Sequence, residues 1–185
     1  MPNGPAAFVP VVHGCDKFCT YCIVPLRRGR ERSRSVSDVL SEVNHLAQHG
    51  VREVTLLGQT VEAYGHDLDE DADLATLFEA IEGIDGILRT RFLTSYPRDL
   101  TDRIIDAVAD LPKVCEHFNM PVQSGDDRVL ERMRRGYTVA DYEQRVHRIR
   151  DRIPDVSIAT DVIVGIPGES EEEFRNTVAL LERVQ

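Results

Sequence analysis

The sequence predicts an α/β protein in which parallel strands form either an open sheet or part of a barrel. Short apolar runs typical of buried strands alternate along the chain with segments whose apolar residues recur at helical spacing. A length of 185 residues and a hydrophobic content of 42% suffice for one domain with its own core. Because strands that alternate with helices pair in parallel through right-handed crossovers, the sheet is either doubly wound or curled into a barrel.

The individual elements follow from periodicity and from residues that start or stop helices. Strands are predicted at residues 8–12, 54–57, 88–94, 117–122 and 156–164. Helices are predicted over about 36–47, 74–81, 100–111, 127–135, 138–152 and 170–181. Ser35, Thr138 and Ser170 each stand three positions before an acidic residue, the spacing of helix N-terminal capping boxes.

Three of the four cysteines lie in one short stretch with the spacing C-x3-C-x2-C, namely Cys15, Cys19 and Cys22. Thiolate is a soft ligand that iron–sulfur clusters prefer. Three thiolates can bind three irons of a [4Fe–4S] cluster, and the fourth iron is then free to bind a small molecule. A zinc site and a disulfide are the alternatives, although zinc usually takes four ligands and disulfides need an oxidising compartment. Cys115 is distant in sequence and is expected to be a buried free thiol.

Polar residues and glycines follow the predicted strands, where ligands of parallel α/β proteins gather. These residues are Gly58, Gln59, Ser95, Gln123, Ser124 and Gly165. Each alone is typical of an ordinary turn, but their common position at the carboxyl ends of the strands predicts a site beside the cysteine stretch.

The net charge of −10 argues against a general nucleic-acid-binding protein. A local exception is a run of arginines just after the cysteines, which could contact phosphates or form a solvated, ion-paired loop. They are Arg27, Arg28, Arg30, Arg32 and Arg34. Acidic runs at 67–73 and 169–173 are expected in a solvated loop and at a helix N-terminus. We expect all six histidines to be structural or solvent-facing. Without a membrane span or an export signal, the chain is expected in the cytoplasm.

Several motifs together resemble those of the MiaB-type tRNA methylthiotransferases, which are radical S-adenosylmethionine (SAM) enzymes. They are the stretches 14–25, 28–30, 56–59, 94–97, 121–125, 135–138 and 160–165, which span nearly the whole chain. Ribosomal-protein methylthiotransferases share the cysteine loop but not the Pro-Val-Gln-Ser-Gly run at 121–125, which favours the tRNA branch.

The resemblance implies that Cys15, Cys19 and Cys22 ligate a [4Fe–4S] cluster and that SAM chelates its open iron. The SAM contacts that it implies are Tyr21, Gly58, Gln59, Ser95, Gln123, Ser124, Ile163 and Gly165. Arg132, Arg134 and Arg135 end a predicted helix, where cations suit the helix dipole, and one of them could approach the SAM carboxylate. Asp161 stands where the family pattern has a glycine.

The resemblance also implies an activity. The cluster would cleave SAM reductively to a 5′-deoxyadenosyl radical, and C2 of an N6-prenylated adenosine next to the anticodon would be methylthiolated. A tRNA anticodon loop and an external electron donor would be the partners, with no membrane involved. The alternatives are ribosomal-protein methylthiolation, another radical SAM reaction, or a non-catalytic iron–sulfur or zinc module.

For the architecture, the resemblance implies a partial (β/α) barrel in which residues 1–185 hold about five of the family's six βα units. The family's N-terminal domain with a second cluster and its C-terminal RNA-binding TRAM domain lie outside this sequence. We therefore expect the isolated chain to bind a cluster, and SAM with it, without completing methylthiolation.

Overall fold

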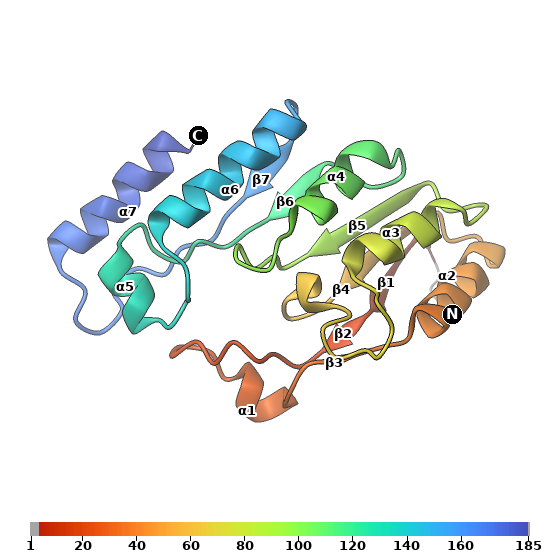
Figure 1. Cartoon of the computed structure of the whole chain (residues 1–185), viewed down its shortest axis with the longest axis horizontal. Coiled ribbons are helices and arrows are strands. Elements are labelled where there is room, and N and C mark those ends of the chain that lie inside the picture. Colours follow the sequence, from red (N-terminus) through yellow and green to blue (C-terminus); the bar gives the residue numbers. More distant parts are fainter. Residues whose placement is uncertain (1–3, 185) are drawn as a thin grey trace.

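Five parallel strands form the spine of the computed structural model, which describes residues 4–184 (Figure 1). In chain order they are β1 (Ala6–Pro10), β4 (Glu53–Leu57), β5 (Arg89–Leu93), β6 (His117–Asn119) and β7 (Ser157–Ala159). β4 pairs with β1 on one side and β5 on the other, and β6 pairs with β7.

Backbone contacts join these two groups of strands into one curved ribbon. Thr90 of β5 forms a parallel bridge with Val114 just before β6. Just after β5, the amide of Ser95 donates to the carbonyl of Asn119 at 2.9 Å. The strands therefore run in the order of the chain, as in part of a (β/α) barrel, and the predicted fold class is confirmed.

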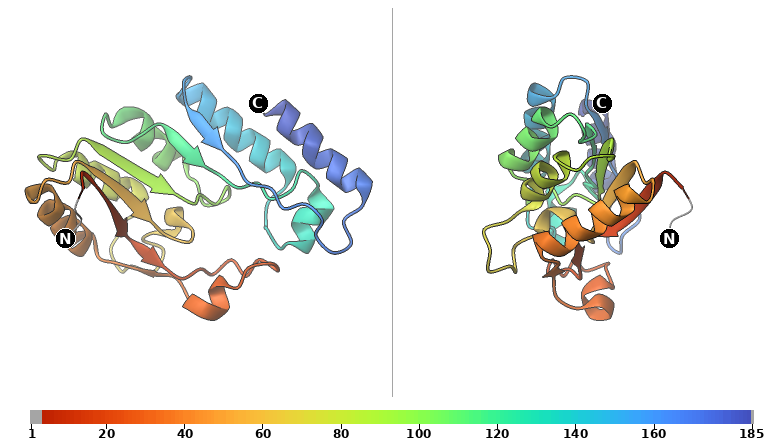
Figure 2. Two further views of the ribbon diagram at one scale, coloured as in Figure 1. Left: turned by 180° about the vertical axis from the view of Figure 1, so that it is seen from behind. Right: turned by 90° about the vertical axis from the view of Figure 1, so that its right-hand side faces the viewer.

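Helices cover one face of this ribbon. They are α2 (Val36–Gln48), α3 (Leu74–Glu82), α4 (Asp102–Asp110) and α6 (Val139–Arg152), while α5 (Asp127–Arg132) and α7 (Glu171–Arg183) lie at the β7 end (Figure 1). Within residues 4–184, the opposite face of the strands carries no helix (Figure 2, left). On β1, Val9 is accordingly fully buried whereas its neighbour Phe8 is 68% exposed. Among residues 4–184, no helix combines the length and the apolar character needed to cross a membrane.

The core lies between the helices and the sheet. Phe78 of α3, Phe92 of β5 and Phe118 of β6 form a continuous aromatic stack, with ring centroids 5.2 and 5.3 Å apart. All three side chains are essentially buried. Tilted and edge-on ring pairs at this distance add to the stabilisation that burial alone provides, so this stack fixes α3 against the middle of the sheet.

The predicted helix starts are confirmed. The side chains of Thr138 and Ser170 each accept from a backbone amide three residues on, and the acidic side chain there accepts in return. Ser35 makes only the first of these bonds, from the amide of Asp38 at 3.1 Å. Such caps satisfy amides that the first helical turn leaves without partners.

The first predicted strand, at residues 8–12, differs from the structure. The parallel strand β1 ends at Pro10, and the chain then turns into β2 (Val12–His13). β2 pairs antiparallel with β3 (Arg32–Ser33). Between β2 and β3 the chain forms the short helix α1 (Val24–Arg28), which sequence periodicity did not indicate. Pro25 in its first turn is compatible with this start, because proline suits the first helical positions.

The fifth predicted strand, at residues 156–164, is also shorter than expected, because β7 ends at Ala159. The hydroxyl of Thr160 accepts from the amide of Val122 at 3.0 Å and donates to the carbonyl of Met120 at 3.0 Å. The hydroxyl of Thr160 thus replaces a backbone group as the hydrogen-bond partner of the segment that follows β6. Parallel pairing resumes only as a single bridge between Gln123 and Val162.

The acidic run at 67–73 is more than the solvated loop that we expected. Asp67 accepts from the amide of Ser33 at 3.0 Å, and Glu70 accepts from the amide of Val36 at 3.3 Å. Asp73 caps α3. These carboxylates therefore hold the loop against β3 and the start of α2.

Candidate functional site

The cysteine loop, residues 14–22, leaves β2 at the carboxyl ends of the strands (Figure 1). On one side, the amide of Gly14 donates to Oε1 of Gln59 at 2.7 Å, just after β4. On the other side, the amide of Thr20 donates to the carbonyl of Met133 at 3.1 Å and its hydroxyl donates to the carbonyl of Arg132 at 3.0 Å. The loop is therefore tied both to the end of β4 and to the end of α5.

All three loop cysteines are free thiols. Cys15 and Cys19 are 8% and 9% exposed, and Cys22 is half-buried. Burial raises the pKa of the Cys15 thiol, an effect opposed by the Lys17 amide and by the hydroxyl of Thr60, which lies 3.6 Å from its sulfur. Because none of the three is in a disulfide, all three sulfurs are available as ligands.

Within residues 4–184, no three histidine, cysteine or acidic side chains are gathered so as to hold a single metal ion. A four-iron cluster makes a different demand, because each thiolate binds a different iron and the sulfurs surround a larger group. The donor set of three soft thiols on one loop fits such a cluster, and so does a buried positive charge beside them.

That positive charge is the guanidinium of Arg135, which lies beyond α5 and is 6% exposed. Its Nη1 donates to Sγ of Cys19 at 3.6 Å and to the hydroxyl of Tyr21 at 3.3 Å. The guanidinium also lies over the rings of Tyr96 and Tyr137, at 4.6 and 5.1 Å from their centroids. From the sequence Arg135 was expected to face the helix dipole or the SAM carboxylate, and its contact with the cysteine loop was not anticipated.

A network of ion pairs and hydrogen bonds anchors Asp16 and Lys17 of the cysteine loop. Nζ of Lys17 lies 2.5 Å from Oδ2 of Asp99 and 3.9 Å from Oε1 of Glu31. The amide of Asp16 donates to the same oxygen of Glu31 at 3.1 Å. Behind this network Glu62 is buried, and its Oε2 accepts from the amide of Tyr96 at 3.2 Å. Burial raises the pKa of Glu62 to about 7.

Gly58, Gln59 and Ser95 were predicted to contact SAM, and the structure places all three near the cysteine loop or its supports. A side chain on Gly58 would overlap Val12, so packing alone demands glycine there. The Gln59 amide oxygen is engaged by Gly14, and Ser95 is buried beside Glu62. Their contact with SAM stays a prediction.

The remaining predicted SAM contacts lie where β6 and β7 end. Gln123 has a φ of 73°, a left-handed conformation that is unusual for a residue with a side chain, and its carbonyl accepts from the amide of Ile163 at 2.9 Å. The amide of Gly165 donates to Glu169 at 2.5 Å. Ser124 is fully buried, with its hydroxyl 3.3 Å from that of Thr177 on α7. Ser124 thus has a structural role, and its contact with SAM stays a prediction.

The arginine run divides into two groups. Arg34 donates to Glu42 at 2.6 Å and to the carbonyl of Pro10 at 2.9 Å, so it supports the fold. Arg30 pairs with Asp16 at 2.8 Å. Arg27, Arg28 and Arg32 are exposed, and none forms an ion pair in the described part of the chain. These three are therefore the available candidates for phosphate contacts.

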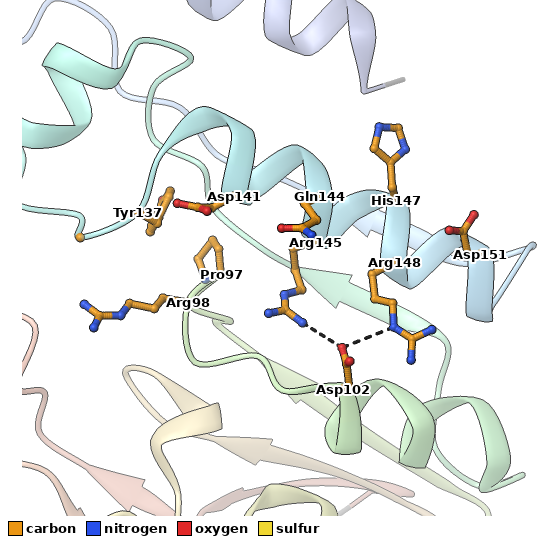
Figure 3. Close-up of a pocket in the computed structure, with 11 residues that line it drawn as sticks. Pro97, Arg98, Asp102, Tyr137, Asp141, Gln144, Arg145, His147, Arg148 and Asp151 are labelled. Atoms are coloured by element: carbon orange, nitrogen blue, oxygen red, sulfur yellow. Dashed lines mark hydrogen bonds and ion pairs between the residues drawn. The ribbon is translucent and has the colours of Figure 1, made fainter.

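A separate hollow of about 740 Å³ lies between the start of α4 and α6 (Figure 3). Arg145 and Arg148 both point at Asp102 from opposite sides, at 3.1 and 3.4 Å (Figure 3). Tyr137 connects this hollow with the cysteine loop, because its ring lines the hollow while its hydroxyl accepts from Arg135. None of the loop cysteines lines it.

Comparison with known families identifies the class of protein. The model of the radical SAM superfamily matches residues 9–181, and the chain therefore belongs to that superfamily. Within it, the chain is 51% identical over 179 residues to the tRNA-2-methylthio-N(6)-dimethylallyladenosine synthase of Thermoanaerobacter pseudethanolicus. It is 53% identical over 176 residues to the synthase of that name from Dehalococcoides mccartyi. These alignments cover 97% and 95% of this chain but only 38% and 42% of the relatives.

Solved structures agree on the fold. The radical SAM methyltransferase TsrM from Kitasatospora setae, with cobalamin and a [4Fe–4S] cluster bound, aligns with a TM-score of 0.77 and 20% identity over 97% of this chain and 34% of its own. The cobalamin-dependent radical SAM enzyme OxsB aligns with a TM-score of 0.79 and 14% identity over 96% of this chain and 26% of its own. The resemblance seen in the sequence is thus confirmed at the level of fold and superfamily.

Proposed function

We propose that this chain is the radical SAM core of a tRNA methylthiotransferase, in which Cys15, Cys19 and Cys22 hold a [4Fe–4S] cluster. The observation that carries the proposal is the placement of three free thiols on one loop pinned at the carboxyl ends of the parallel strands. Identity of about half to named tRNA methylthiotransferases over nearly the whole chain supports the tRNA branch. A ribosomal-protein substrate is tested by assaying product on tRNA and on ribosomal protein in parallel.

Cys15, Cys19 and Cys22 would hold the cluster, which, once reduced by an external donor, would supply the electron for reductive cleavage of SAM. The residues of the chain would bind the cluster and SAM, orient them and shelter them from water. Gln59 holds the start of the cysteine loop, and Thr20 holds its other end against α5. The burial of Cys15 and Cys19 keeps water from their sulfurs. The backbone of Gln123 bonds to the carbonyl of Asp161 and to the amide of Ile163, which holds the ends of β6 and β7 together beside the position that we assign to SAM.

Reductive cleavage of SAM tests this proposal. The chain is reconstituted anaerobically with iron and sulfide and then given a reductant and SAM. We expect release of 5′-deoxyadenosine, because an iron without a protein ligand can bind SAM. Cys19→Ser should abolish both the cluster absorbance and the release, whereas Cys115→Ser, which alters a free thiol outside the loop, should retain both. A metal-loaded chain that leaves SAM intact would identify a non-catalytic module.

The free arginines beside the loop are assigned to the phosphates of the tRNA anticodon loop. Removing Arg27 and Arg28 together should weaken binding of an anticodon stem–loop and lower the magnitude of the slope of log K against log salt by about 1 for each arginine. Arg183→Ala is the matched control, because Arg183 is also exposed but lies on α7 and pairs with Glu143. The measurement is a fluorescence-anisotropy titration across a salt series. Equal slopes for all three proteins would remove these arginines from the interface.

A further inference from the structure

Arg135 is a buried cation without an acidic partner. Its side chain is almost completely enclosed, yet no carboxylate in residues 4–184 forms an ion pair with it. A buried charge normally needs a counter-ion, because transfer of a lone ion out of water is very costly. Arg132, one turn earlier, has such a counter-ion, because it pairs with both oxygens of Glu173 at 2.9 and 3.1 Å.

The partners of Arg135 are neutral oxygens and one sulfur. Nε donates to the hydroxyl of Tyr137 at 2.9 Å, and Nη2 donates to the carbonyl of Pro121 at 3.0 Å. The remaining nitrogen, Nη1, faces Tyr21 and Sγ of Cys19. The hydroxyls of Tyr137 and Tyr21 are phenols, which are uncharged at physiological pH. Among the described residues that the guanidinium contacts, the cysteine loop is therefore the one that can bring negative charge to it.

The guanidinium is also held rigidly. The rings of Tyr96 and Tyr137 lie over it, and the hydroxyl of Tyr96 donates to the carbonyl of Arg135 itself. The amide of Arg135 donates to the carbonyl of Leu130 at 3.0 Å, which fixes the backbone to α5. A planar group clamped in this way keeps its direction toward the sulfur, which a flexible lysine would not.

We propose that Arg135 is a positioning residue that directs a fixed positive charge and a hydrogen bond at the Cys19 sulfur and thereby raises the reduction potential of the cluster. The inference rests on the proposed function, because it needs a cluster on Cys15, Cys19 and Cys22. Reduction adds an electron to an already anionic group, so a nearby cation stabilises the reduced form more than the oxidised form. Hydrogen bonds to cluster sulfurs and local charge are the protein's established means of setting such potentials.

The test is the midpoint potential of the reconstituted cluster, measured by an anaerobic redox titration followed by electron paramagnetic resonance without SAM. Arg135→Gln should shift the reduction equilibrium at least tenfold toward the oxidised cluster, which for one electron corresponds to about 59 mV. Arg135→Lys should shift it less, because it retains the charge but loses the planar clamp. Arg132→Gln should leave the potential within a twofold change, because its cation is already paired with Glu173.

Each outcome bears on a different claim. Iron and sulfide uptake by the parent chain tests the proposed function, and a parent that takes up no cluster removes both claims together. A parent that loads normally, with an unchanged potential in Arg135→Gln, overturns the role of Arg135 alone. If Arg135→Gln keeps its circular dichroism and melting temperature but takes up no iron while Arg132→Gln loads, the cation is required at the sulfur. If Arg135→Gln unfolds, Arg135→Met replaces it as the uncharged variant, and a parental potential there refutes the assignment.

Discussion

Replacing Gly14 with alanine is expected to displace the cysteine loop and to prevent the chain from taking up iron. Gly14 has a φ of +85°, and an added Cβ would overlap the carbonyl oxygen of Arg30 and lie 2.7 Å from that of Gly29. Both are backbone atoms, which cannot move aside as a flexible side chain could. The amide of Cys15 also donates a hydrogen bond to the Gly29 carbonyl at 3.2 Å, so a shift there would reach the first cysteine. Strain at positive φ and overpacking together should cost about 3 kcal/mol.

Gly29→Ala is a matched control for this change. Gly29 has a similar φ of +77° in the segment that faces Gly14, but an added Cβ would meet no atom within 4 Å. Its cost should be limited to the backbone strain, about 1–3 kcal/mol, because a φ of 77° with a ψ of −161° is adopted almost only by glycine. Iron content is therefore the measurement that separates the two variants best. Thermal unfolding and iron content after reconstitution measure both effects. Equal melting temperatures and equal iron uptake for the two variants would show that the close approach at Gly14 does not shape the loop.

Glu62→Gln is expected to stabilise the folded chain above neutral pH and to change little at pH 5. Glu62 is 1% exposed, and burial raises its pKa from the ordinary 4.5 to about 7. Asp99 adds to this effect through charge repulsion, while the nearby Ser95 hydroxyl and the hydrogen bond from the Tyr96 amide oppose it. A glutamine side chain is neutral at every pH and can still accept from the amide of Tyr96.

The way in which stability depends on pH follows from the pH at which Glu62 loses its proton in the unfolded and in the folded chain. Below pH 4.5 Glu62 is protonated whether the chain is folded or unfolded, so it contributes no penalty. Between pH 4.5 and 7 the unfolded chain loses this proton while the folded chain keeps it, and stability falls as pH rises. Above pH 7 both states are ionised, and the loss levels off at about 3 kcal/mol. The variant should therefore exceed the parent by about that amount at pH 8.

Urea unfolding of parent and variant at pH 5 and pH 8 measures this difference. Glu173→Gln is a control of opposite sign, because Arg132 lowers the pKa of Glu173 to about 2. The parent should be the more stable of that pair at neutral pH, and the difference should shrink as pH falls toward 2. A constant gap between Glu62→Gln and the parent from pH 5 to pH 8 would show that Glu62 does not titrate as an isolated buried acid.

Much of the site's location was accessible from the sequence. The cysteine spacing, the alternation of strands and helices, and the residues at strand ends together placed the site at the carboxyl edge of a parallel sheet. The caps at Thr138 and Ser170 were also predicted, since a capping box depends on residues only three apart. These features are local or depend on a fixed spacing, and local spacing is what a sequence displays directly.

The details that escaped prediction depend on side chains meeting across long separations. The contact of Ser124 with Thr177 of α7 was not predicted, because it joins residues 53 positions apart. An ion pair was one of the alternatives for the arginine run, but the partner of Arg34, Glu42 on α2, was not predicted. The hydroxyl of Thr160 interrupts the last strand pair, although residues 156–164 have the composition of one continuous strand.

The class of fold, the three-thiol loop and the resemblance to radical SAM enzymes could all be predicted from the sequence alone. They depend on periodicity and on the order of residue types. Only the tertiary structure showed that Arg135 lies against Cys19, that Glu62 is buried, and that Gly14 is closely packed on the backbone of Arg30. Arg135 and Cys19 are 116 positions apart, and their contact exists because the curvature of the sheet brings the end of α5 to the cysteine loop. Periodicity encodes which face of an element is buried but not which distant side chain it will meet.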